Sequence, residues 1–289
     1  MTIYGLDFTS APRKRKPITC AVCTLEGTTL HYERIEHLTS FTQFEAFLQR
    51  PGPWVAGFDF PFGQPRDLIE RLGWPQTWAG YVGWLGGMRM KQFEHILRMF
   101  RDSRPRGQKH LYRQVDAPTG AISPMLLYRI PIGRMFFRGA PRLLASGVSV
   151  IPCHPTESDR VALEAYPALV ARRWLGSESY KNDVKDKQTA AQKDARRRLV
   201  QALRSAELHR HYGLRLTLGD ANAAHLIEDP GGDDLDALLC AIQAAWAALR
   251  RESGWGIPAG VDRLEGWIVD PISLSVPTPE PRRTADRTT

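Results

Sequence analysis

Short apolar runs that end on a carboxylate indicate where this chain forms buried strands. Residues 54–60 are almost wholly apolar, carry Asp59 near their end and are stopped by Pro61, a pattern typical of a buried strand. Residues 2–8 form a second run of this kind, with Asp7 in the same place. Because a carboxylate at the mouth of a buried strand is costly unless a metal, a cation or hydrogen bonds compensate it, both acids need partners.

A glycine stands two positions before each of these acids. Side chains alternate between the two faces of a strand, so Gly5 shares a face with Asp7, and Gly57 shares one with Asp59. We therefore expect an empty space beside each carboxylate, through which a ligand could approach.

The remaining pattern predicts a three-stranded meander followed by helices and strands. Residues 18–24 and 28–35 are expected to continue the first strand as a hairpin, and a later strand at 160–167 carries Glu164. Apolar residues spaced three and four apart predict helices at 41–48, 168–175, 189–206 and from 233 onward. The chain is therefore expected to be an α/β protein.

The last of these helices begins with two acids one turn apart. In Asp233-x-x-Asp236, Asp236 lies beside the apolar stripe of the helix and Asp233 about 60° further round on the same side. Both carboxylates could therefore point to one place. An N-cap role is the alternative for Asp233 or Asp234, whereas Asp236 is already inside the helix.

Regular alternation of strands and helices stops in the middle of the chain. Residues 64–142 contain helical pieces interrupted by Gly and Pro, which predicts a helical insertion into a core made of 1–63 and 143–270. Residues 271–289 are rich in Pro, Thr and Arg without apolar periodicity, so we expect a disordered tail.

The insertion carries the positive charge of the chain. The formal net charge is +8, and the 89–142 stretch holds twelve basic residues against three acidic ones. Such a stretch suggests nucleic acid as a partner, and nearby tryptophans suit stacking of unpaired bases. A solvated basic face and a small tryptophan core of the insertion are the alternatives.

Targeting signals are not evident in the sequence. No stretch approaches eighteen uninterrupted apolar residues, and the first residues form a predicted strand instead of a leader peptide. Four cysteines are too few for a disulfide framework. We therefore expect a soluble, cytoplasmic protein with no membrane partner.

The predicted acids have the chemistry of a phosphodiester hydrolase. In-line attack of water on a phosphodiester requires that the attacking and the leaving oxygen are both stabilised. Two Mg²⁺ or Mn²⁺ ions roughly 4 Å apart do this when convergent carboxylates hold them. The candidates are Asp7, Asp59, Glu164, Asp233 and Asp236.

The order of these parts resembles the ribonuclease-H-like superfamily. Asp233-x-x-Asp236 looks like the terminal helix of RuvC-type resolvases, and six short motifs in order resemble those of the DUF429 family. The motifs are Gly5-Leu6-Asp7, Gly57-Phe58-Asp59-Phe60-Pro61, Glu164-Ala165-Tyr166-Pro167, Tyr180-Lys181, Asp236-Ala237-Leu238-Leu239-Cys240-Ala241 and Glu265-Gly266-Trp267-Ile268. The resemblance implies a mixed sheet, an antiparallel meander followed by parallel strands, flanked by helices.

The resemblance also implies a metal-dependent nuclease. By position, Asp7 and Asp236 would bridge or hold Mg²⁺ or Mn²⁺, with Asp59 as the ligand from the second strand. Asp233 or Glu164 would complete the metal shell.

The Tyr180-Lys181 motif suggests a role for its lysine, and two other functions are alternatives to a nuclease. Lys181 would contact the scissile phosphate or stabilise the leaving group, unless it is an exposed loop lysine. A catalytically silent nucleic-acid-binding module would leave the acids with structural roles. Phosphoryl transfer on a small molecule, as in actin-like kinases, is the third function, although no second glycine-rich phosphate loop is evident.

Overall fold

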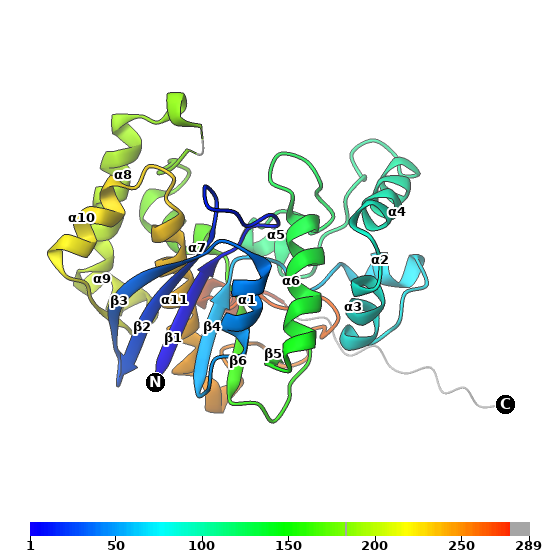
Figure 1. Ribbon diagram of the computed structural model, residues 1–289, viewed down its shortest axis with the longest axis horizontal. Coiled ribbons are helices and arrows are strands. Elements are labelled where there is room, and N and C mark those ends of the chain that lie inside the picture. The colour runs from blue at the N-terminus through cyan, green and yellow to red at the C-terminus, as the bar shows by residue number, and fades with distance from the viewer. Residues whose placement is uncertain (183, 278–289) are drawn as a thin grey trace.

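One mixed sheet organises the chain, which a computed structural model describes at residues 1–182 and 184–277 (Figure 1). The strands lie in the order β5-β6-β4-β1-β2-β3-β7. Their bounds are β1 Thr2–Asp7, β2 Ile18–Glu26, β3 Thr29–Leu38, β4 Trp54–Phe58, β5 Ser149–Ile151, β6 Arg160–Glu164 and β7 Arg215–Thr217.

Strand directions agree with the predicted topology. Strands β1, β2 and β3 form an antiparallel meander, whereas β4 and β6 continue the sheet in parallel beyond β1. Strands β5 and β7 add parallel edges beside β6 and β3. The predicted mixed α/β sheet is therefore confirmed, and its topology is consistent with a ribonuclease-H-like fold.

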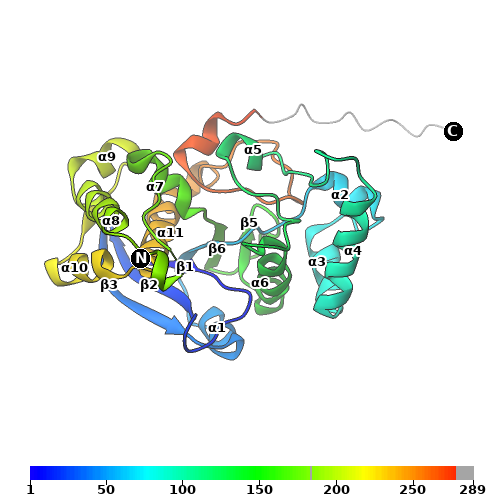
Figure 2. The same cartoon turned by 90° about the horizontal axis from the view of Figure 1, so that it is seen from above.

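Helices cover both faces of the sheet (Figure 2). Helix α11 (Asp233–Ala248) lies against β1, β2 and β4; α7 (Pro167–Leu175) packs beside it, and α8 (Ala190–Leu203) packs against α7. Helices α1 (Phe41–Leu48) and α6 (Ile132–Ser146) lie on the opposite face. The strands serve both layers because their residues alternate: Ile3 and Val55 pack with α11, whereas Tyr4 and Ala56 pack with α1.

The structure also contains elements that the pattern did not predict. Short strands β5 and β7 and helices α9 and α10 were missed. The helices are α1 Phe41–Leu48, α2 Arg66–Arg71, α3 Trp78–Gly86, α4 Met90–Asp102, α5 Asp116–Thr119, α6 Ile132–Ser146, α7 Pro167–Leu175, α8 Ala190–Leu203, α9 Ala206–Tyr212, α10 Asp220–Glu228 and α11 Asp233–Ala248. Among the described residues, none of these helices is long and apolar enough to cross a membrane.

Helix α11 approaches the sheet unusually closely at two glycines. A Cβ at Gly5 would collide with the backbone of Ala237 and Ala241, and one at Gly57 would lie 2.5 Å from the Cys240 carbonyl oxygen. The expectation of an empty space for a ligand at these glycines is therefore wrong, because the α11 backbone fills it. The glycines instead bring the helix, and its acids, onto the strand ends.

Burial of α11 also differs from the predicted amphipathic stripe. Every residue from Asp234 to Ala248 is buried, because the sheet covers one side of the helix and neighbouring helices cover the other. A helix enclosed in this way has no polar face. Its acids are therefore interior groups.

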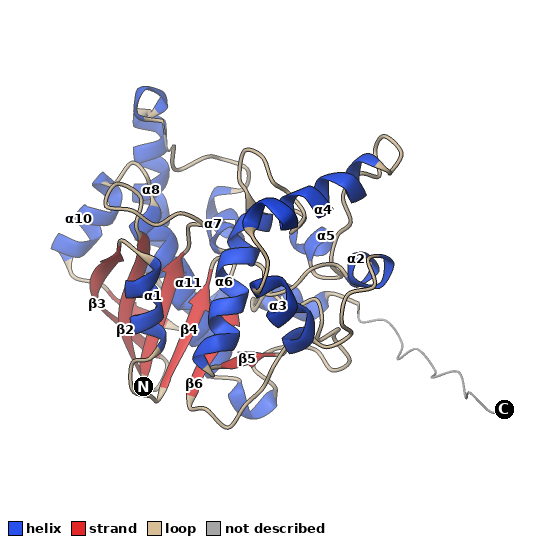
Figure 3. Cartoon of the chain, turned by 45° about the vertical axis from the view of Figure 1, so that its right-hand side comes forward, coloured by secondary structure: helices blue, strands red, loops and turns tan. Residues whose placement is uncertain are grey.

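Helices α2 to α4 stand beyond the β5 edge of the sheet (Figure 3). Trp74 and Trp78 are buried in this region, but they join the core on the α1 face of the sheet and do not form a separate core of the insertion; Trp84 is 45% exposed. Helix α6 also begins inside the predicted insertion, but Phe136 and Leu143 join the core on the α1 face of the sheet.

The C-terminal end of the described chain is ordered. A 3-10 helix at Pro271–Ser275 buries Ser273, and Val276 is buried after it. The predicted disordered tail is therefore wrong for residues 271–277, because these few residues dock on the protein despite their composition. Residues 278–289 lie outside the described residues.

Candidate active site

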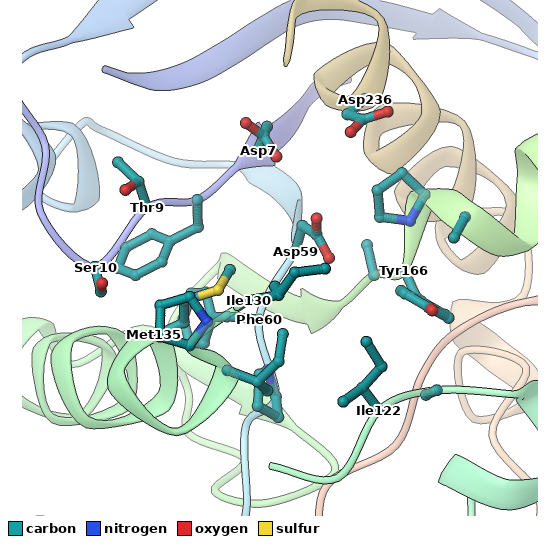
Figure 4. Close-up of a pocket in the computed structure, with 18 of the residues that line it drawn as sticks. Asp7, Thr9, Ser10, Asp59, Phe60, Ile122, Ile130, Met135, Tyr166 and Asp236 are labelled. Carbon is teal, nitrogen blue, oxygen red and sulfur yellow. The ribbon is translucent and has the colours of Figure 1, made fainter. Parts of the chain in front are cut away.

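Two adjacent strands and one helix bring the predicted acids together. Asp7 ends β1, and Asp59 directly follows β4, its parallel neighbour. The Asp59 amide donates a hydrogen bond of 2.9 Å to the Leu6 carbonyl, which fixes the two strand ends side by side. The first turn of α11 adds Asp233 and Asp236. Figure 4 shows Asp7, Asp59 and Asp236 around one space.

That space is a cavity of about 360 Å³. It contains every residue that the sequence singled out as a candidate for the site. These residues are Asp7, Asp59, Glu164, Lys181, Asp233 and Asp236. Residues almost the whole chain apart therefore share one pocket.

Asp7 is buried, and its charge is not compensated by a hydrogen bond from the described residues. Its exposed fraction is only 8%, yet within the described residues no donor hydrogen-bonds to its carboxylate. Burial raises the pKa of Asp7 well above its usual value. Lys181 opposes this shift, and the neighbouring acids Asp236, Asp233 and Asp59 reinforce it.

Asp59 is partly buried and has a similar environment. Burial, followed by the charge of Asp236, raises its pKa to about 7, against the opposing effect of Lys181. Its carboxylate also accepts no hydrogen bond from the described part of the chain. Two carboxylates at adjacent strand ends thus remain available to a cationic ligand.

Asp236 is the acid held most firmly. It is 1% exposed; the Tyr180 hydroxyl donates a hydrogen bond of 2.5 Å to Oδ1, and the Lys181 ammonium contacts Oδ2. Burial alone would lower the pKa of Lys181, but Asp236 outweighs it, so the pKa is raised well above its usual value. Lys181 is therefore a charged member of the cavity, and its alternative as a merely exposed loop lysine is wrong.

Asp233 has a lysine of its own. Both of its oxygens lie 3.0 Å from the Lys16 ammonium. Burial nevertheless raises the pKa of Asp233, with Lys16 opposing the shift. A role for Lys16 in the site was not predicted, although this lysine lies in the basic turn that follows Asp7 and β1.

The N-cap alternative for the first acids of α11 is wrong. Gly232 is the N-cap, with a left-handed φ of 71°, and makes no side-chain cap. Asp234 turns away from the cavity and lies 3.1 Å from Nε2 of His37 and 2.6 Å from Nε2 of His225. Of the three acids at the start of α11, Asp233 and Asp236 therefore line the cavity, and Asp234 does not.

Glu164 lines the cavity but is already neutralised. Arg113 donates to both of its oxygens, at 2.8 and 2.6 Å, and the Phe62 amide donates at 2.9 Å. Burial raises the pKa of Glu164 against the effect of Arg113. The same guanidinium also pairs with Asp116, at 2.8 Å. Glu164 therefore holds the insertion to the core, in place of the expected role in a metal shell.

Not all basic residues of the 89–142 stretch lie on the surface, as Arg113 shows. It is only 3% exposed, so it does not belong to a phosphate-binding surface. Arg98 and Arg134 are both paired with Glu94, at 2.6 Å. Internal ion pairs thus offset part of the charge of the 89–142 stretch.

The opposite wall of the cavity is apolar, which the sequence did not predict. Residues 121–135 supply most of it, and Phe60 and Tyr166 extend it (Figure 4). Ile122 and Ile130 are 39% and 53% exposed at this wall. The cavity therefore combines a charged half and an apolar half.

The charged half presents carboxylate oxygens to the cavity. Hard carboxylate oxygens suit these ions, and Asp7 and Asp59 have no competing donor in the described chain. As their side chains lie, no three His, Cys, Asp or Glu residues of the described chain are arranged to hold a metal. Lysines instead balance Asp233 and Asp236.

Comparison with known proteins finds one family model that matches part of the chain. Residues 134–263 match the family model of DUF429, a protein of unknown function. This segment contains Glu164, Lys181, Asp233 and Asp236, whereas Asp7 and Asp59 precede it. No curated protein matches the chain significantly, and no solved structure does. The chain is therefore similar to DUF429 over residues 134–263, a segment somewhat shorter than half of its length.

Proposed function

We propose that this protein is a metal-dependent phosphodiester hydrolase that acts on nucleic acid. The observation that carries the proposal is the buried Asp7 carboxylate, which has no hydrogen-bond donor among the described residues and faces Asp59 and Asp236 across one cavity. A buried carboxylate of this kind is costly to the fold. A function that requires a cation at this place would explain why the site retains it.

The acids and the lysine would divide the work. Asp7, Asp59 and Asp236 would hold Mg²⁺ or Mn²⁺, which when bound supplies an activated water and neutralises developing charge. Lys181, with its side chain 37% exposed at the cavity, would donate to a phosphate oxygen. Basic residues of the 89–142 stretch that remain exposed would track the rest of the strand.

Hydrolysis of labelled oligonucleotides tests the proposal. Wild-type protein should cleave them in Mg²⁺ or Mn²⁺, and EDTA should abolish cleavage. Asp7→Asn should slow cleavage about a hundredfold or more, because a metal ligand is lost. Asp194→Asn is the matched control, since Asp194 lies on α8 with its side chain 62% exposed. Equal cleavage by wild type and Asp7→Asn would refute the proposal.

One observation favours a second candidate, a catalytically silent nucleic-acid-binding module. Asp236, Asp233 and Glu164 already have cationic partners in Lys181, Lys16 and Arg113. Such a module would bind oligonucleotides with steep salt dependence, unaffected by EDTA, and release no product.

A further inference from the structure

The apolar wall of the cavity is not explained by phosphate chemistry. Ile122 and Ile130 lie in the loop before α6, and both remain more than one-third exposed beside the acids. Met135 and Tyr166 continue this wall. A surface that binds only a sugar–phosphate backbone is polar and cationic, so this wall indicates a ligand with an apolar part.

A nucleotide combines the two chemistries that the cavity offers. Its phosphate suits the charged half, once a cation is held there, and the face of its base suits the apolar half. Arg129 also lines the cavity beside Ile130 and is exposed, so it can contact the adjacent phosphate of a strand. The acids, the apolar wall and Arg129 thus offer a phosphate site, a base site and a second phosphate site, in the order in which these groups occur along a single nucleic-acid strand.

Only an unpaired nucleotide can use both halves at once. In a duplex the faces of the bases are stacked inside and unavailable to a protein wall. A cavity of about 360 Å³ is at the small end of ligand pockets, and it is far too small for two paired strands. The base must therefore leave its stack, or be unpaired from the start, to enter.

We propose that the cavity receives one unpaired nucleotide, with its base against the Ile122 and Ile130 wall and its phosphate at the acids. The inference rests on the proposed function, because the phosphate is placed at the acid site. Single strands and frayed ends are then bound in preference to duplex.

Binding in solution tests this preference directly. The probe is a short fluorescein-labelled DNA strand, alone or in a blunt duplex, with Ca²⁺ in place of Mg²⁺, and the readout is fluorescence anisotropy at fixed salt. The single strand should bind about tenfold more tightly than the duplex, since base contacts of this kind contribute strongly to single-strand binding. Equal affinity for the two probes, or no binding of either, would overturn the inference.

Substitution of the wall shows whether the preference comes from the cavity. The double variant Ile122→Ala/Ile130→Ala should weaken single-strand binding about tenfold and leave duplex binding unchanged, because the lost apolar area contacts only an unpaired base. Ile272→Ala is the matched control, since Ile272 is 44% exposed and does not line the cavity. A double variant that binds the single strand like the wild type, or that weakens both probes equally, contradicts the inference.

Hydrolysis, measured separately, distinguishes this inference from the proposed function. Cleavage of duplex as fast as of single strand would refute the unpaired-nucleotide site and leave the hydrolase intact. A single-strand preference that depends on Ile122 and Ile130 without any cleavage would support the site and refute the hydrolase.

Discussion

At the scale of single residues, the acids of the cavity differ in what compensates their charge. Glu164 has an arginine and an amide, Asp236 has a tyrosine and a lysine, and Asp233 has a lysine. Among the described residues, none donates a hydrogen bond to the carboxylate of Asp7 or Asp59, and the charge of Lys181 is what lowers the pKa of both. Ionisation of these two acids at the strand ends is therefore unfavourable to the fold.

Removing the charge of Asp59 should stabilise the protein at neutral and higher pH. Its pKa is about 7 in the folded protein against 3.8 ordinarily, so ionisation costs folding free energy as pH rises from about 4 through 7, and protonation removes this cost below about 4. Asp59→Asn should raise the free energy of unfolding at pH 8 by an amount on the order of a few kcal/mol. The gain should vanish near pH 4.

Chemical denaturation at several pH values measures this gain. Asp194→Asn serves again as the exposed control and should leave the curve almost unchanged. A loss of stability in Asp59→Asn at pH 8 would mean that the charged carboxylate has a compensating partner in solution.

Lys181 should compete with a divalent cation for Asp236. Its ammonium contacts the carboxylate oxygen that a metal would use. Lys181→Ala should therefore tighten Mn²⁺ binding several-fold and still slow hydrolysis, because the contact to phosphate is lost. Calorimetric titration with Mn²⁺ measures the affinity.

The control for this variant is Lys193→Ala, which removes an exposed lysine paired with Glu228 on the protein surface. It should change neither Mn²⁺ affinity nor hydrolysis. Weaker Mn²⁺ binding in Lys181→Ala would show that the lysine supports the metal site.

At the scale of elements, the close approach of α11 to β1 and β4 creates the site. Glycines at positions 5 and 57 allow the helix backbone to lie directly on the strands. One turn of the helix then places Asp236 beside the strand-end acids. The site geometry therefore depends on the absence of two side chains.

A methyl group at Gly5 should separate these elements. Gly5→Ala would press its Cβ into the backbone at Ala237 and Ala241, which cannot move without shifting α11. The expected cost is about 3 kcal/mol or more of unfolding free energy, together with loss of hydrolysis. Thermal unfolding and activity measure the two effects.

Gly83→Ala is the matched control. It lies within α3, where an added Cβ would meet only the Leu144 side chain at 3.6 Å. This change should be neutral or stabilising, since alanine favours the helix. A Gly5→Ala protein as stable as wild type would contradict the tight packing of α11.

At the scale of the whole molecule, one buried guanidinium connects the 64–142 region to the core. Arg113 pairs with Asp116 in its own segment and with Glu164 at the end of β6, and it donates to the Glu265 carbonyl at 3.0 Å. Three parts of the chain therefore meet at one side chain, beside the cavity.

Loss of Arg113 should be severe because it leaves two buried acids unpaired. Arg113→Met should lower the free energy of unfolding by about 3–5 kcal/mol. Arg98→Met is the control: its pair with Glu94 is half-exposed, and its loss should cost about 1 kcal/mol or less. Denaturant unfolding of the two variants compares them. Similar costs would contradict the role of Arg113.

Prediction from the sequence succeeded where the signal is local. A strand that ends on Asp7, a strand directly followed by Asp59 and a helix with acids one turn apart are each visible in a few neighbouring residues. Glu164 was found as an acid on a strand, but its role was not, because Arg113 is 51 residues away along the chain. Short elements such as β5, β7 and α9 were missed, since three to seven residues carry too little periodicity.

The order of neighbouring side chains is enough to predict the alternation of strands and helices, the acids at their ends and the excess of basic residues, because each of these is a local property of the chain. Packing of distant segments sets which acids meet a lysine or an arginine and which, among the described residues, accept no hydrogen bond. Packing also brings the apolar segment 121–135, the loop before α6 and the first residues of that helix, to the cavity that holds the acids. These features depend on distances between residues far apart in the chain, which are set only when the sheet, α11 and the loop pack together.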